Sequence, residues 1–84
     1  MASFLVERYV PSTPIREIEA AIERLLAVEA EGGDGARHLW TALIEAEETC
    51  LSLFEARSEA AVEVANRAAR FPFDRVVCAA IIRR

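Results

Sequence analysis

The chain has 84 residues and a mass of 9.3 kDa, which is enough for one small domain over residues 1–84. Hydrophobic residues make up 54% of the sequence and the mean hydropathy is +0.19, values that exclude an intrinsically disordered chain. The net charge of −4, from 14 acidic and 10 basic residues, argues against a nucleic-acid partner, because no basic surface is available for phosphate groups.

The first half of the chain is predicted to form a strand, a helix and a second strand. Ser3 to Tyr9 is an apolar, β-branched and aromatic run, which is typical of a strand. A helix is expected next, with Thr13 as its N-cap and Pro14 at its first position. Its apolar residues recur at helical spacing as far as the glycine-rich turn at 32–35, and the second strand is predicted over Arg37 to Ile44.

The second half is predicted to contain a strand, a helix and a final strand. An acidic connection at Glu45 to Glu48 leads into Thr49 to Ala56, and strands joined this closely form an antiparallel hairpin. Ser58 is a good N-cap for a helix that reaches about Arg70, and the last strand is expected at Arg75 to Ile82. The order βαββαβ predicts an α+β, ferredoxin-like fold, with a four-stranded antiparallel sheet and both helices on one face.

The sequence also favours a cytoplasmic protein that does not span a membrane. Charged residues interrupt every apolar run well before the roughly 18 residues that a membrane span needs. The N-terminus lacks a basic start and reaches Glu7 after a few apolar residues, unlike a secretory leader. Cys50 and Cys78 are too few for a disulfide scaffold, so we expect two reduced thiols.

If no bulge interrupts the strands, side-chain alternation divides the predicted sheet into two faces. The first face is aliphatic or small, and we expect it to pack under the helices: Phe4, Val6, Leu39, Leu43, Leu51, Leu53, Val77, Ala79 and Ile81. The second face is expected to hold the only histidine, tryptophan and tyrosine and both cysteines: Leu5, Glu7, Tyr9, His38, Trp40, Ala42, Ile44, Cys50, Ser52, Phe54, Val76, Cys78, Ala80 and Ile82.

This second face is too apolar to remain in water, because the largest apolar patch on a typical monomer covers only a few hundred Å². Association with a second copy would bury it and create a homodimeric α+β barrel. A cavity lined by aromatic rings and a few polar groups is also the usual form of a small-ligand site. We therefore predict a homodimer that binds a small apolar ligand or a metal ion on this face, with these ligand-binding residues: Glu7, Tyr9, Trp40, Ser52 and Phe54.

Two further kinds of chemistry are possible on the same face. Glu7, His38 and Cys50 offer oxygen, nitrogen and sulfur donors to a divalent transition metal, although their spacing forms no local motif. Glu7 is also a candidate catalytic base for an isomerase or cyclase, because apolar surroundings favour the protonated carboxyl group. An iron–sulphur cluster is not expected, since the four-cysteine pattern is missing.

Structural alternatives to each of these functional interpretations remain open. Glu7 could form an ion pair with one of the arginines, and His38 could make an ordinary hydrogen bond at an interface. The two cysteines could be small buried hydrophobic residues. In that case the second face would be only the core of a dimer interface.

Three segments carry a family resemblance: FLVERYVP, ETCLSLFEARSEAAV and ANRAARFPFDRVV. Their most specific parts are Glu7-Arg8, the run Cys50 to Ala56 and the helix exit Phe71 to Arg75. Through them the chain resembles a family of small bacterial proteins known from nickel-binding, ferredoxin-like members. The resemblance implies a homodimer and a nickel site, yet the histidines of metal-binding members correspond here to Trp40 and Ala65, which cannot ligate nickel.

Overall fold

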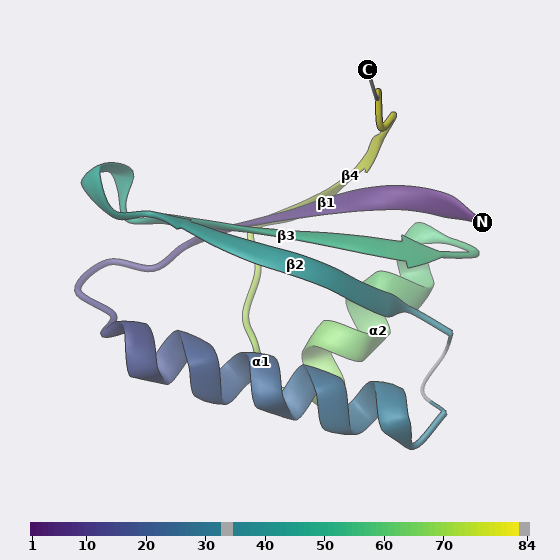
Figure 1. Ribbon diagram of the computed structural model, residues 1–84, viewed down its shortest axis with the longest axis horizontal. Helices are drawn as coiled ribbons and strands as arrows, with labels where there is room; N and C mark the ends of the chain where they lie inside the picture. The colour runs from purple at the N-terminus through teal and green to yellow at the C-terminus, as the bar shows by residue number, and fades with distance from the viewer. Residues whose placement is uncertain (33–34, 83–84) are drawn as a thin grey trace.

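The computed structural model describes residues 1–32 and 35–82, and it confirms the βαββαβ order (Figure 1). Both helices lie on the same side of the sheet, and the described part of the chain places no element over the other side. The elements are β1 (Ala2–Tyr9), α1 (Ile15–Ala30), β2 (Arg37–Ile44), a 3-10 turn (Glu45–Glu47), β3 (Thr49–Ala56), α2 (Glu59–Ala68) and β4 (Arg75–Ala79).

The bounds of β2 and β3 agree with the sequence prediction, and the ends of the other elements differ by a few residues. Pro14, rather than Thr13, is the N-cap of α1, because the Thr13 hydroxyl donates instead to the carbonyl oxygen of Pro11 at 3.2 Å. Gly32, just past α1, has a φ of +90°, a conformation that favours glycine. β4 ends at Ala79, earlier than predicted, and residues 33–34 of the glycine-rich turn lie outside the described residues.

The sheet has the strand order β2-β3-β1-β4 and is antiparallel throughout. Because residues directly opposite each other share a face, the register sorts the side chains. Phe4 of β1 lies opposite both Phe54 of β3 and Cys78 of β4, and Phe4 and Phe54 are buried under the helices. We call this side the covered face, and its residues are Phe4, Val6, Arg8, His38, Thr41, Leu43, Cys50, Ser52, Phe54, Ala56, Val76 and Cys78.

The side without helices is called the open face. Its charged residues, Glu7, Arg37, Glu55 and Arg75, lie towards the ends of the strands, and its other residues are Leu5, Tyr9, Trp40, Ala42, Ile44, Leu51, Leu53, Val77 and Ala79. The predicted faces are therefore right for β1 and wrong for β3 and β4, whose side chains are exchanged. The prediction placed aliphatic Leu51 and Leu53 inside because of their residue type, whereas the register with β1 places Cys50, Ser52 and Phe54 inside.

A β-bulge between His38 and Trp40 explains the remaining difference. Two residues of β2, Leu39 and Trp40, occupy the space opposite Leu53, so that His38 lies on the covered face and Trp40 on the open face. The predicted grouping of His38 with Trp40 is wrong for this reason. The predicted open positions of Trp40 and Ile44 are confirmed.

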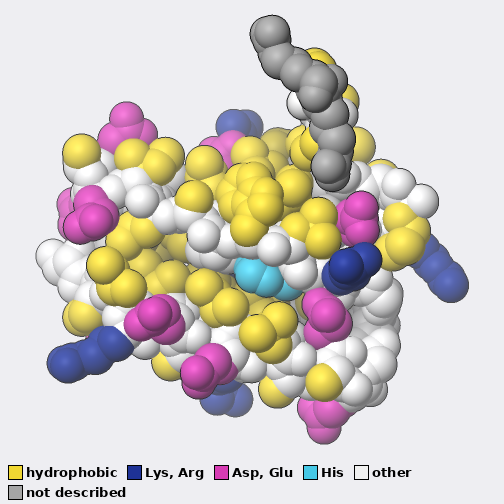
Figure 2. Space-filling model, in the orientation of Figure 1, with side chains coloured by type: hydrophobic (Ala, Val, Ile, Leu, Met, Phe, Trp, Pro, Cys, Tyr) yellow, Lys and Arg dark blue, Asp and Glu magenta, His cyan; other side chains and the backbone are white. Residues whose placement is uncertain are grey.

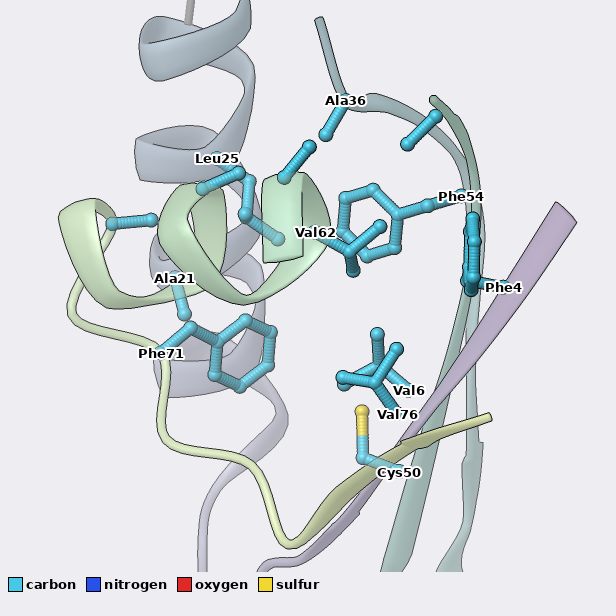
Figure 3. Packing of buried hydrophobic residues seen from close by; sticks show 14 of the residues in the cluster. Phe4, Val6, Ala21, Leu25, Ala36, Cys50, Phe54, Val62, Phe71 and Val76 are labelled. Carbon is cyan, nitrogen blue, oxygen red and sulfur yellow. The ribbon is translucent and has the colours of Figure 1, made fainter. Parts of the chain in front are cut away.

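The hydrophobic core lies between the covered face and the helices (Figure 3). The side chains of Val6 and Phe54 point from the sheet towards Val62 and Phe71, and Leu25 of α1 completes this layer. No helix of the described residues is both long and apolar enough to pass through a lipid bilayer.

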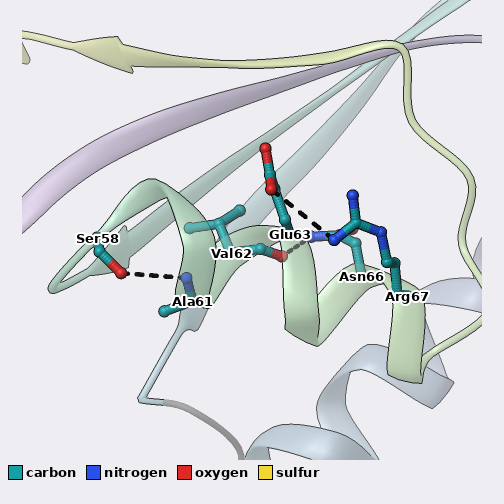
Figure 4. Close-up of polar contacts among 6 residues, drawn as sticks. All are labelled: Ser58, Ala61, Val62, Glu63, Asn66 and Arg67. Carbon is teal, nitrogen blue, oxygen red and sulfur yellow. Dashed lines mark hydrogen bonds and ion pairs between the residues drawn. The ribbon is translucent and has the colours of Figure 1, made fainter.

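The predicted N-cap of α2 is confirmed, because the Ser58 hydroxyl accepts a hydrogen bond from the amide of Ala61 at 3.1 Å (Figure 4). A cap of this kind satisfies a backbone donor that the first helical turn leaves free. Further along the helix, the buried amide of Asn66 donates to the carbonyl oxygen of Val62 at 2.8 Å. The cap and this internal hydrogen bond stabilise α2, and the chain that leaves its C-terminal end leads to Phe71 and Pro72.

Candidate functional site

The three predicted metal ligands lie on two different faces of the sheet. Glu7 is on the open face and accepts a hydrogen bond from the Arg75 guanidinium at 2.9 Å. This is the ion pair with an arginine that was considered as the structural alternative to a metal-binding or catalytic role of Glu7. His38 and Cys50 lie on the covered face. Within residues 1–32 and 35–82, no group of three or more histidine, cysteine or acidic side chains is placed to hold a metal ion.

The predicted ligand-binding residues are divided in the same way. Glu7, Tyr9 and Trp40 share the open face, where Tyr9 is 62% and Trp40 is 45% exposed. Ser52 and Phe54 are buried on the covered face and cannot reach a ligand that lies on the open face. The buried hydrogen-bonded side chains of the molecule lie elsewhere, around a residue that was not among the predicted site residues.

That residue is Arg8, which is only 1% exposed. Its guanidinium donates to the Ser52 hydroxyl at 3.0 Å and to the carbonyl oxygens of Phe71 and Pro72, each at 3.3 Å. It also lies 3.4 Å from the centroid of the Phe71 ring, a cation–π contact. Burial lowers the pKa of Arg8 to about 10, so the group stays charged at neutral pH.

A chain of hydrogen bonds continues from Arg8 to His38. The Ser52 hydroxyl lies 2.8 Å from the Thr41 hydroxyl, and the latter lies 2.7 Å from Nε2 of His38. The His38 backbone amide donates to a carboxylate oxygen of Glu29 at 2.8 Å, and the imidazole meets Phe54 edge to face. Burial lowers the pKa of His38, and the Arg8 charge lowers it further against the opposing effect of Glu29.

Cys50 lies opposite Arg8 in the sheet and is fully buried. Burial raises the pKa of the Cys50 thiol more than the Arg8 charge lowers it. A thiol that keeps its proton is a poor nucleophile and a poor metal ligand. Cys78 is exposed, and neither it nor Cys50 forms a disulfide bond within the described chain.

The described residues of a single chain do not fit a nickel ion. Imidazole nitrogens and thiolates are suitable donors for nickel, but the interior offers one imidazole, already hydrogen-bonded to Thr41, and the protonated thiol of Cys50. The buried Arg8 cation would also repel a divalent cation placed beside these groups. The two positions aligned with family histidines do not help, because Trp40 is on the open face and Ala65 is buried in α2 on the helix side.

Arg8 and Thr41 were not predicted as interior residues, although strand alternation indicates an interior position for both. Arg8 follows Phe4 and Val6 at every second position of β1, so the same alternation that placed those two residues inside also places Arg8 inside. Thr41 lies between Leu39 and Leu43, which the same alternation placed inside, but its proximity to His38 could not be found in this way, because the bulge brings His38 onto that face. Arg8, Ser52 and Phe71 come from the three segments that carried the family resemblance, and these segments meet here.

Comparisons with known proteins complete the description. A family model described as "Nickel responsive protein SCO4226-like" matches residues 4–78. The crystal structure of SCO4226 from Streptomyces coelicolor A3(2) is similar, with a TM-score of 0.85 and 19% sequence identity over 98% of this chain and 100% of that chain. At this identity the likeness concerns the fold alone. The search of curated proteins found no match.

Proposed function

Since the chain belongs to the nickel-responsive SCO4226-like family, we propose that it is a small homodimeric binding protein whose two copies join through their open faces. The observation that carries this proposal is the apolar surface of the open face. Trp40 and Ile44, on the edge strand β2, are 45% and 39% exposed on this face, and the three other strands contribute further aliphatic side chains to it. Figure 2 views the molecule from the side, with the helices below the sheet, and shows hydrophobic side chains along the length of the sheet.

The charges of the open face support the same arrangement. Glu7 and Arg75 form an ion pair at 2.9 Å towards one end of the strands, and Arg37 and Glu55 form one at 3.7 Å towards the other. Between these pairs the face is apolar. A surface with an apolar centre and a polar rim is typical of a protein–protein interface.

The proposed ligand site lies between the two sheets and uses Glu7, Tyr9 and Trp40, the predicted binding residues that share the open face. An enzyme with Glu7 as its base receives less support, because Arg75 already holds this carboxylate in an ion pair. We also propose a cytoplasmic location, which the two free thiols support, since reduced cysteines are stable in that compartment.

The homodimer is tested by measuring molar mass in solution with light scattering. Trp40→Glu places a charge on the apolar surface of the proposed interface and should yield monomers. Leu26→Glu is the matched control, because Leu26 is 47% exposed on α1 and lies outside the open face. A monomeric wild-type protein, or a Trp40→Glu variant that remains dimeric, would contradict the proposal.

Nickel binding is a second candidate function, which the family description favours. It is tested by calorimetric titration of chelator-stripped protein with a nickel salt. Micromolar binding that Glu7→Gln weakens and His38→Ala leaves unchanged would place the ion at the open face of the dimer. Binding that His38→Ala weakens about 10–100-fold would place the ion in the interior and contradict our reading of that site. An absence of heat would remove this candidate.

A further inference from the structure

A groove lined by both charged and apolar side chains lies on the helix side of the molecule. It is bounded by α1, by the β1–α1 loop and by the α2–β4 connection, and its volume is about 340 Å³. Small-molecule sites typically measure about 300–1,000 Å³ and combine an apolar lining with a few polar groups. The side chains that matter for its chemistry are Tyr9, Pro11, Glu17, Arg24, Arg70 and Phe71.

Two guanidinium groups give the groove its positive charge. Nε of Arg24 donates to the carbonyl oxygen of Ala69 at 2.6 Å, and a terminal nitrogen of Arg24 donates to the carbonyl oxygen of Arg70 at 3.3 Å, which fixes this cation in the wall. Arg70 is exposed and, among the ion pairs of the described residues, has no acidic partner. Glu17 contributes the opposing charge, so the lining holds two cations and one anion.

The other side of the groove is apolar and firmly held. Phe71 and Pro72 form part of the wall, and Arg8 binds both of their carbonyl oxygens from the interior side. The backbone amide of Phe71 also donates to the carbonyl oxygen of Asn66 at 3.0 Å. A wall fixed by bonds at these peptide groups needs little ordering when a ligand binds, and this lowers the cost of association.

We infer that this groove binds a small organic anion, with a carboxylate between Arg24 and Arg70 and an apolar body against Phe71 and Pro72. The planar donors of Arg70 match the two oxygens of a carboxylate, whereas Arg24, whose Nε and one terminal nitrogen already bind carbonyl oxygens, contributes its charge and its remaining donors. Apart from Tyr9, at the end of β1, the lining of the groove lies away from the open face, so the inference does not rest on the dimer.

The test is a titration with phenylacetate, followed through the backbone amide signals of the ¹⁵N-labelled protein, with uncharged phenylacetamide as the matched probe. Phenylacetate should shift the signals of Thr13, Ala20 and Phe71, which line the groove, and phenylacetamide should bind about tenfold more weakly. Arg70→Gln should weaken phenylacetate binding by a similar factor. Glu17→Gln should strengthen it, because the opposing charge is removed.

Arg16→Gln is the control for a general effect of charge, because Arg16 is an exposed neighbour on α1 that does not line the groove. Equal weakening by Arg16→Gln and Arg70→Gln would overturn the inference, since the probe would then respond only to net charge. Equal affinity for the two probes, or signal shifts confined to the open face, would overturn it as well.

Discussion

The two faces of the sheet differ in how their polar side chains are bonded. On the covered face, Arg8, Ser52, Thr41 and His38 are joined by hydrogen bonds, so the interior satisfies most of its polar groups without help from a second molecule. On the open face the charged groups are paired at the margins and the middle is left apolar. The difference teaches that the polar groups of the covered face are bonded within the folded chain, whereas the apolar surface that we propose as an interface lies on the open face.

The largest expected effect on the free energy of unfolding comes from Phe54, a core aromatic residue, and we compare it with Trp40 on the proposed interface. Phe54→Ala should lower the free energy of unfolding by about 4 kcal/mol, because it empties a fully buried site. This loss should be the same at every protein concentration, whereas the loss caused by Trp40→Ala should depend on concentration if Trp40 lies between two copies. Urea unfolding at two well-separated concentrations measures both. A small cost for Phe54→Ala would mean that our assignment of the faces of β3 is wrong.

The next effect concerns the buried cation. Arg8→Ala should cost about 3 kcal/mol, because the carbonyl oxygens of Phe71 and Pro72 and the Ser52 hydroxyl lose a donor inside the protein. Arg8→Lys keeps the charge and should recover only part of the stability, since an ammonium group cannot reproduce the fork of bonds. Urea unfolding of both variants provides the measurement. If Arg8→Met is as stable as the wild type, the polar cluster does not stabilise the fold.

A smaller effect is expected from His38 as the pH changes. Its pKa is lower in the folded chain than the usual value of 6.5, so the unfolded chain binds a proton first. The contribution to stability is complete above pH 6.5 and is lost as the pH falls from there through the folded-state pKa. The slope for one proton cannot exceed about 1.4 kcal/mol per pH unit. His38→Asn should remove this part of the pH dependence, and an unchanged profile between about pH 7 and 5 would contradict the assignment.

The smallest effect is expected for the ion pair of the open face. The hydrogen bond and charge of Glu7 raise the pKa of Arg75, but the pair is partly in water and is therefore screened. Glu7→Gln and Arg75→Gln should each shift the urea midpoint slightly, and the shift should vanish in about 1 M salt. A shift that persists in high salt would indicate that the dimer buries this pair.

Much of the fold could be predicted from the sequence, because its signals are local. The bounds of β2 and β3, the Ser58 cap and the element order follow from apolar patterns and from residues that favour turns and caps. The faces of β3 and β4 could not be predicted by the same means. They depend on the pairing with β1, where Phe54 and Cys78 lie opposite Phe4, and residue type alone suggested the reverse.

The candidate site was predicted less well for the same reason. Glu7, His38 and Cys50 seemed to share one face only because each strand was assigned independently. The sheet separates Glu7 from the other two, and an extra residue in β2 directs His38 inwards. The interior position of Arg8 could have been predicted from strand alternation. The hydrogen bond between Thr41 and His38 depends on the bulge and could not be derived from spacing.

Leu39, the extra residue in β2, also affects whether the edge of the sheet can pair with a strand of another molecule. β2 is an edge strand of the sheet, and a regular edge exposes a row of backbone donors and acceptors on which a foreign strand can assemble. The bulge at Leu39 interrupts this row near the start of β2. Deleting Leu39 would restore a regular strand without exchanging its faces, and we expect the resulting protein to be more prone to form fibrils. One extra residue in β2 thus makes this edge of the sheet less suited to pairing with another strand.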